Sequence, residues 1–275
     1  MKQRAIRNSM PAAKSTWIIA ISNYQLTLRK TDIDMRDYKL GFISNETIFN
    51  HVKQTVELYR THINLKDFNK NIIDPIKLTF DAKVYGKTLD EIIESESIRQ
   101  IDKTNTNHIG YFHQNLFRYA GNGWEVPEAG FDVVNEKLHI FAELKNKHNT
   151  MNSRAADSVY RHMQNKILHD DQATCMLVEV IATKSRNEKW FYDNLSHEKI
   201  RRVSIDKFYG IVFGDDLAFF KLCKSLPDIL DDVINNLHCG AIHSSVYDEL
   251  RELSPDTFKS LYLLAFKTYD GFQRF

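Results

Sequence analysis

Three residues whose types and spacing could perform chemistry lie in one short stretch of the chain. Asp132 is followed after ten residues by Glu143, and Lys145 comes two positions later. Two carboxylates together with the Leu144 carbonyl form an oxygen-rich ligand set that suits Mg²⁺ better than zinc. A lysine beside such a metal can orient or deprotonate a metal-bound water and neutralise charge that grows on a phosphorane. The combination is typical of phosphodiester hydrolysis.

A strand over 138–145 would present these groups, because side chains alternate between the two faces of a strand. One face carries an apolar set and the other a mixed set: Leu138, Ile140, Ala142 and Leu144 against His139, Phe141, Glu143 and Lys145. If the preceding turn is centred on Glu136 and Lys137, Asp132 lies opposite Phe141 and diagonal to Glu143, with Cβ atoms roughly 7–8 Å apart. One divalent cation could bridge that gap. A slip of one residue would move Asp132 to the other face, and spacing alone equally allows a solvated ion-pair ladder on a hairpin.

The surrounding pattern predicts an α/β protein. We expect helices near 45–61, 88–100, 106–120, from an N-cap at Ser153 to about 168, and over 217–237 with an interruption at Pro227. We expect strands within 71–85 and over 130–134, 138–145, 174–182, 200–205 and 209–213. Residues 1–40 are interpreted as a strand-containing arm or extension, and residues 41–275 as a single domain.

Composition narrows the functional classes. The 275 residues carry 37 basic and 36 acidic side chains, so the net charge of +1 gives no argument for a polyanionic partner and any nucleic-acid site must be local. The stretch from Lys137 to Lys166 contains six basic and two acidic residues, which gives a local excess of positive charge beside the motif.

The cysteines and the apolar runs indicate a cytoplasmic protein. Cys175, Cys223 and Cys239 are odd in number and widely spaced, which favours free thiols over a zinc clip. No apolar run approaches the roughly 18 residues that a membrane span needs, and the basic N-terminus does not continue as a secretory signal. Phosphate-loop, serine-hydrolase and zinc-protease motifs are absent from the sequence.

The pattern of Asp132, Glu143 and Lys145 resembles the PD-(D/E)xK nuclease signature, with Phe131 in place of its proline. The wider run over 107–133 is similar to the type II restriction endonucleases that cut GGNCC and narrower relatives of that site. The block over 107–150 is the specific part of this resemblance, which extends by order of elements over roughly 41–275.

This resemblance implies a mixed central β-sheet flanked by helices and a Mg²⁺-dependent cut of double-stranded DNA that leaves 5′-phosphate and 3′-hydroxyl ends. Mn²⁺ is expected to substitute. Asp132 and Glu143 become metal ligands, and Lys145 becomes the catalytic lysine. A palindromic target implies a homodimer, and a restriction system implies a cognate DNA methyltransferase in a bacterial cytoplasm.

Further candidates surround the motif. Glu128 and His113 are possible additional acid, base or metal-shell residues, although a surface-loop position and a core histidine are the alternatives. Candidate DNA contacts are Asn146, Lys147, Asn149, Asn152, Ser153, Arg154, Lys184 and Arg186, or else these residues belong to solvated polar loops. Arg186 could read a guanine, since arginine pairs bidentately with that base.

Two other functions remain open from the sequence. A repair or recombination nuclease of the same fold would prefer junctions, nicks or mismatches to a short palindrome. A non-catalytic DNA-binding module would show no metal-dependent cleavage.

Overall fold

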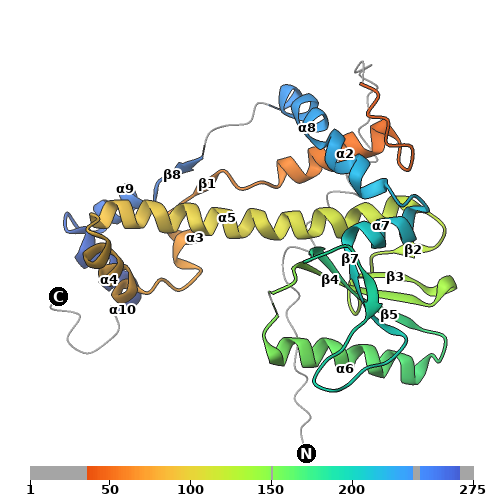
Figure 1. Ribbon diagram of the computed structural model, residues 1–275. Helices are drawn as coiled ribbons and strands as arrows, with labels where there is room; N and C mark the ends of the chain where they lie inside the picture. The colour runs from red at the N-terminus through yellow and green to blue at the C-terminus, as the bar shows by residue number, and fades with distance from the viewer. Residues whose placement is uncertain (1–35, 150, 238–241, 267–275) are drawn as a thin grey trace, which may run out of the picture.

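A long helix, α5 (Leu89–Leu116), joins two units that lie at its opposite ends (Figure 1). The computed structural model describes residues 36–149, 151–237 and 242–266. We call the part built around the large sheet the sheet unit, and the small helical part at the N-terminal end of α5 the helical unit. The N-terminal arm expected over 1–40 lies outside the described residues except for 36–40, where Tyr38 and Leu40 are buried in the core of the sheet unit.

The sheet unit contains a mixed sheet of six strands in the order β2-β3-β4-β5-β7-β6. The strands are β2 (Trp124–Glu125), β3 (Val133–Asn135), β4 (Ile140–Lys147), β5 (Thr174–Ile181), β6 (Asn187–Lys189) and β7 (Ile200–Ser204). The central strands β4, β5 and β7 run parallel, whereas β2, β3 and β6 pair antiparallel to their neighbours. Parallel strands covered on both faces need continuous apolar runs, which β5 supplies. The predicted mixed sheet flanked by helices is confirmed.

Helices cover both faces of this sheet (Figure 1). Helix α6 (Ser153–His169) lies on one face, and α2 (Asn45–Glu57), α7 (Ile205–Phe213), α8 (Ala218–Asn236) and the C-terminal part of α5 lie on the other. Alternate residues of β4 enter different cores, since Phe141 belongs to the cluster under α6 and Ala142 to the cluster under α5 and α7. The free Cys175 and Cys223 agree with the expected thiols, while Cys239 lies outside the described residues.

The helical unit has a core of its own. It consists of α3 (Leu65–Asn69), α4 (Pro75–Tyr85), α9 (Val246–Leu253), α10 (Thr257–Phe266) and a short parallel pair, β1 (His62–Ile63) with β8 (His243–Ser244). Phe68, Ile93 and Leu250 are buried in this core. Within the described part of the chain, no helix is long and apolar enough to cross a membrane.

The structure differs from the predicted elements in five respects. The strand expected within 71–85 is wrong: Asp74 caps a helix that has Pro75 in its first turn, the position where proline costs least. The helices expected over 88–100 and 106–120 are one helix, and the strand expected over 209–213 is the end of α7. Helix α8 continues through Pro227, and the N-cap of α6 is Asn152 rather than Ser153.

Two short 3₁₀ helices complete the path of the chain near the site. The first, η1 (Phe117–Ala120), follows α5 and ends at Gly121, whose φ of 66° favours glycine. The second, η2 (Glu136–Leu138), forms the turn between β3 and β4.

Candidate active site

The register of β3 and β4 places Asp132 level with Glu143. Val133 pairs with Ala142 and Val134 with Phe141, and Asp132 directly precedes Val133, the first residue of β3, so continuing this register sets Asp132 opposite Glu143. The predicted register, with Asp132 opposite Phe141, is wrong by two residues, because the turn contains η2 and a left-handed residue, His139 at φ 51°. A shift of two preserves the alternation of side chains. Asp132 therefore still lies on the side expected for it.

The Asp132 carboxylate lies at the open edge of β4. Because β3 begins at Val133, the backbone of β4 beyond Ala142 has no strand partner on this side, and the Leu144 amide donates a hydrogen bond of 2.8 Å to Asp132 Oδ2. The amide and carbonyl of one strand residue point to the same edge, so the Leu144 carbonyl also faces the Asp132 side. Gln114 of α5 donates from Nε2 to the Asp132 carbonyl at 3.1 Å.

Phe131 holds the start of this segment in place. It is buried against Phe141, and its ring stacks on His162 of α6 with 4.3 Å between ring centroids. The residue that replaces the proline of the nuclease signature thus anchors the backbone directly before Asp132.

Glu143 and Lys145 project from the same face of β4 and form an ion pair. The Lys145 ammonium donates to Glu143 Oε1 at 2.7 Å, and both side chains are half-buried. Partial burial reduces screening by water, so this pair holds the lysine more firmly than a fully exposed pair would. The structure therefore brings Asp132, Glu143, Leu144 and Lys145 together on one hairpin.

A cleft of about 580 Å³ opens between α5 and β4 at this point. Its walls include Tyr111 and Gln114 from α5 and Asp132, Lys145 and Lys147 from the hairpin. Helix α5 approaches β4 closely here, because a Cβ added to Gly110 would meet the Asn146 side chain at 3.3 Å. The carboxylate of Asp132 and the ammonium of Lys145 are thus accessible to a molecule in the cleft.

The donor set fits a hard divalent cation. Two carboxylates and one backbone carbonyl are oxygen ligands of the kind that Mg²⁺ prefers, with water completing its shell. Among the described residues, no group of three or more His, Cys, Asp or Glu side chains is arranged to hold a metal. A metal at this position would depend on the two carboxylates, the Leu144 carbonyl and water.

Comparison with known proteins gives the family. The family model described as Eco47II restriction endonuclease matches residues 40–235, which include every strand of the six-stranded sheet. The chain belongs to this family.

Two curated relatives agree. The type II restriction enzyme Sau96I of Staphylococcus aureus is 32% identical over 216 residues, covering 73% of this chain and 83% of that enzyme. The type II restriction enzyme Eco47II of Escherichia coli is 27% identical over 213 residues, covering 71% of this chain and 88% of that enzyme. No solved structure matches the chain. As an Eco47II family member, the protein is a type II restriction endonuclease, which confirms the resemblance and the enzyme class expected from the sequence.

The two additional candidates lie away from the cleft of this Eco47II family member. Glu128 is exposed on the loop before β3. His113 is buried in the core, where its Nδ1 pairs with the Tyr209 hydroxyl at 2.9 Å. Burial lowers the pKa of His113 to about 4, and the nearby His51 adds a smaller effect in the same direction. The structure therefore gives His113 the place of a neutral core histidine.

The candidate DNA contacts differ in how accessible they are. The exposed ones lie at the end of β4 or in the segments that follow β4 and β5: Lys147, Asn149, Ser153, Arg154 and Lys184. Asn152, also exposed, accepts a hydrogen bond from the Ala155 amide as the cap of α6, and Asn146 donates to the Thr106 carbonyl. Arg186 is mostly buried, with 10% of its side chain exposed, and pairs with Glu179.

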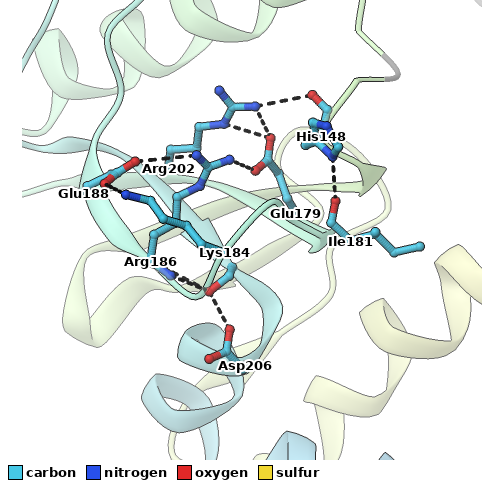
Figure 2. A network of polar contacts seen from close by, with 9 residues as sticks. His148, Glu179, Ile181, Lys184, Arg186, Glu188, Arg202 and Asp206 are labelled. Carbon is cyan, nitrogen blue, oxygen red and sulfur yellow. Dashed lines mark hydrogen bonds and ion pairs between the residues drawn. The ribbon is translucent and has the colours of Figure 1, made fainter.

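Glu179 and Arg202 are the residues near this site that the sequence pattern missed. Glu179 is fully buried on β5, where it binds both Arg186 and Arg202 (Figure 2). A single acidic residue inside the apolar run Thr174–Ile181 is a signal that could have found it, because a buried carboxylate requires a partner.

Proposed function

We propose that this Eco47II family enzyme hydrolyses double-stranded DNA at a short palindromic site of the GGNCC type and leaves 5′-phosphate ends. The observation that carries the proposal is the convergence of Asp132, Glu143 and Lys145 at the open edge of β4, where Asp132 and Lys145 line a cleft. The spacing of these residues and the strand that presents them support a PD-(D/E)xK core.

Each residue has a role in this proposal. Asp132, Glu143 and the Leu144 carbonyl would hold Mg²⁺, which when bound polarises the scissile phosphate and lowers the pKa of a bound water. Mn²⁺ accepts the same oxygen ligands. Lys145, held by Glu143, would orient the attacking water and place positive charge beside the phosphate as negative charge develops on it.

The substrate implies partners. The exposed basic and amide side chains after β4 would contact DNA phosphates, which set the position of the duplex. A palindromic site implies a two-fold homodimer. A DNA methyltransferase of the same specificity would protect the host DNA.

The test is cleavage of unmethylated phage DNA in Mg²⁺, with EDTA as control, followed by sequencing of the fragment ends. Discrete ends that share one palindrome are expected. Ragged ends or cutting only at junctions would favour a repair nuclease, and no cleavage would favour a binding module.

Variants of the hairpin test the roles. Asp132→Asn, Glu143→Gln and Lys145→Ala should each slow cleavage by about 10³-fold or more while duplex binding persists, because they remove groups that act on the reacting phosphate. Glu136→Gln is the matched control, since Glu136 is exposed on the turn of the same hairpin. Near-normal cleavage by either carboxylate variant would refute the metal-site assignment.

A further inference from the structure

A buried charged cluster lies beside the catalytic strand. Glu179 of β5 is the register partner of Lys145 on β4. Its Oε2 accepts from Arg186 Nη2, and its Oε1 accepts from Arg202 Nε at 2.8 Å and also from Arg202 Nη2 (Figure 2). Glu188 also pairs with Arg186 and with Lys184, so three positive groups share two carboxylates at this edge of the sheet.

The two arginines are held differently. The backbone of Arg186 is fixed to Ser204, and its Nη1 lies 3.5 Å from Glu188, a residue that also pairs with Lys184. Arg202 is more accessible, with 28% of its side chain exposed. Arg202 is therefore the member of the cluster that a ligand could reach.

The hydrogen bonds of Arg202 determine what it can bind. A guanidinium has five N–H donors. The Nε donor serves Glu179, and Nη2 donates to both Glu179 and the His148 carbonyl, the latter at 3.3 Å. Among the described residues, the remaining nitrogen, Nη1, has no hydrogen-bond or ion-pair partner. Reading a guanine takes two nitrogen donors side by side. Arg202 has one nitrogen left for a ligand, so it suits a single phosphate oxygen better than a guanine.

The position of Arg202 fits a phosphate close to the reacting one. Glu143, Leu177 and Arg202 form one row across β4, β5 and β7, and residues in one row of a parallel sheet share a face. Strands are spaced about 4.8 Å apart, so the Cα of Arg202 is roughly 10 Å from that of Glu143. Successive phosphates of one DNA strand are about 3.4 Å apart along the helix axis, which places neighbours of the scissile phosphate within this range.

We propose that Arg202 contacts the DNA backbone through one phosphodiester near the scissile one, and that Glu179 is the positioning residue that holds it. This inference rests on the proposed nuclease function. Because Glu179 and the His148 carbonyl fix the guanidinium before DNA arrives, little side-chain freedom is lost on binding. The contact is independent of sequence, because it involves no base.

Salt dependence of binding tests this contact. The full-length protein, Arg202→Gln and Arg201→Gln would be titrated in EDTA with two 30-base-pair duplexes, one bearing GGNCC and one scrambled, at several salt concentrations. Arg201 is the matched control, because it neighbours Arg202 but points to the other face and binds Asn187. Loss of one phosphate contact should reduce the slope of log K against log salt by about 0.9, equally on both duplexes.

The outcomes separate the two proposals. An unchanged slope for folded Arg202→Gln, or a loss confined to the GGNCC duplex, would overturn the inference while the nuclease function stands. If the wild-type protein neither binds nor cleaves duplex DNA, the proposed function fails and the inference fails with it.

A measurement on the wild-type protein does not depend on folding of a variant. Phenylglyoxal modifies accessible arginines, and mass spectrometry locates the modified sites. Duplex DNA should protect Arg202 and leave the modification of Arg201 unchanged. Equal modification of Arg202 with and without bound DNA would overturn the contact.

Discussion

The sheet unit and the helical unit treat charged groups in opposite ways. The sheet unit buries Glu179 between two arginines and buries His51 and His113 in its core. The i,i+3 and i,i+4 ion pairs of the helical unit, such as Lys77 with Asp81, each include an exposed side chain, and the pair of Arg60 with Asp67 is only partly buried. Buried polar groups cost free energy of folding unless they are fully paired. In the sheet unit, the cost of burying these polar groups therefore offsets part of the free energy of folding, and the buried groups are held in fixed positions. The helical unit is stabilised by its apolar core.

The family match extends over the sheet and over part of the helical unit, including α3 and α4. It covers residues 40–235, and therefore the whole six-stranded sheet. The helical unit is completed by β8, α9 and α10, which lie beyond the match and contribute Val246 and Leu250 to the second core. The proposed active site thus lies in the matched part, and the unmatched C-terminal helices complete the packing around the start of α5.

The largest difference between the units should appear when one carboxylate of each is neutralised. Glu179→Gln removes the buried carboxylate that binds both guanidinium groups and leaves Arg186 with the more distant Glu188, so it should lower the free energy of unfolding by about 3 kcal/mol. Urea denaturation at pH 7 measures this change.

The control is Asp81→Asn in the helical unit, which removes an i,i+4 pair with the exposed Lys77. Such a pair contributes about 0.5 kcal/mol or less. Similar losses in both variants would contradict the contrast between the two units.

Acid should next weaken the sheet unit through its buried histidines. Burial lowers the pKa of His51 and of His113 from 6.5 to about 4. The unfolded chain then binds more protons than the folded one between these values, so stability falls as the pH falls from about 6.5 to about 4. Each histidine should account for about 2 kcal/mol of loss between pH 7 and pH 5, measured by urea denaturation across this range.

Two variants assign this acid sensitivity to the sheet unit. His113→Gln should reduce the loss between pH 7 and pH 5 by about 2 kcal/mol, since one titrating group is gone. His62→Gln should leave the loss unchanged, because His62 is exposed in the helical unit, stacked on His243. If His62→Gln reduced the loss of stability and His113→Gln did not, the acid sensitivity would lie in the helical unit and the prediction would be wrong.

The alternation of side chains along β4 was easier to predict from the sequence than the turns and long-range contacts around that strand. Alternation along β4 was enough to place Glu143 and Lys145 on one face, and an error of two residues in register did not move Asp132 to the other face. The error arose at His139, because a left-handed conformation at a non-glycine residue has no reliable sequence signal.

Other features depend on contacts between distant segments. The alternating Ile76, Leu78 and Phe80 indicated a strand, yet they lie on a helix that buries Leu78 and exposes the other two. Helix α5 continues past residue 100 through a polar stretch in which the Asn105 side chain bonds to the backbone of Arg60. The cluster of Glu179 with its two arginines requires the order of β5, β6 and β7, which the sequence pattern alone does not supply.

The smallest predicted effect concerns the N-terminus of α5, which lies in the helical unit. Thr88 caps this helix: its hydroxyl accepts from the Glu91 amide, and the Glu91 side chain bonds back to the Thr88 amide. Thr88→Ala should lower the free energy of unfolding by about 1 kcal/mol. DNA cleavage at 25 °C should stay normal, because the cleft lies at the other end of α5 and the first turn frays locally.

Ser95→Ala, on the exposed side of the same helix, is the control, since its hydroxyl donates to the Glu91 carbonyl and does not cap the helix. A fall in cleavage rate for Thr88→Ala without a fall in Ser95→Ala would show that α5 transmits strain between the units, so that the helical unit takes part in positioning Gln114 and Asp132.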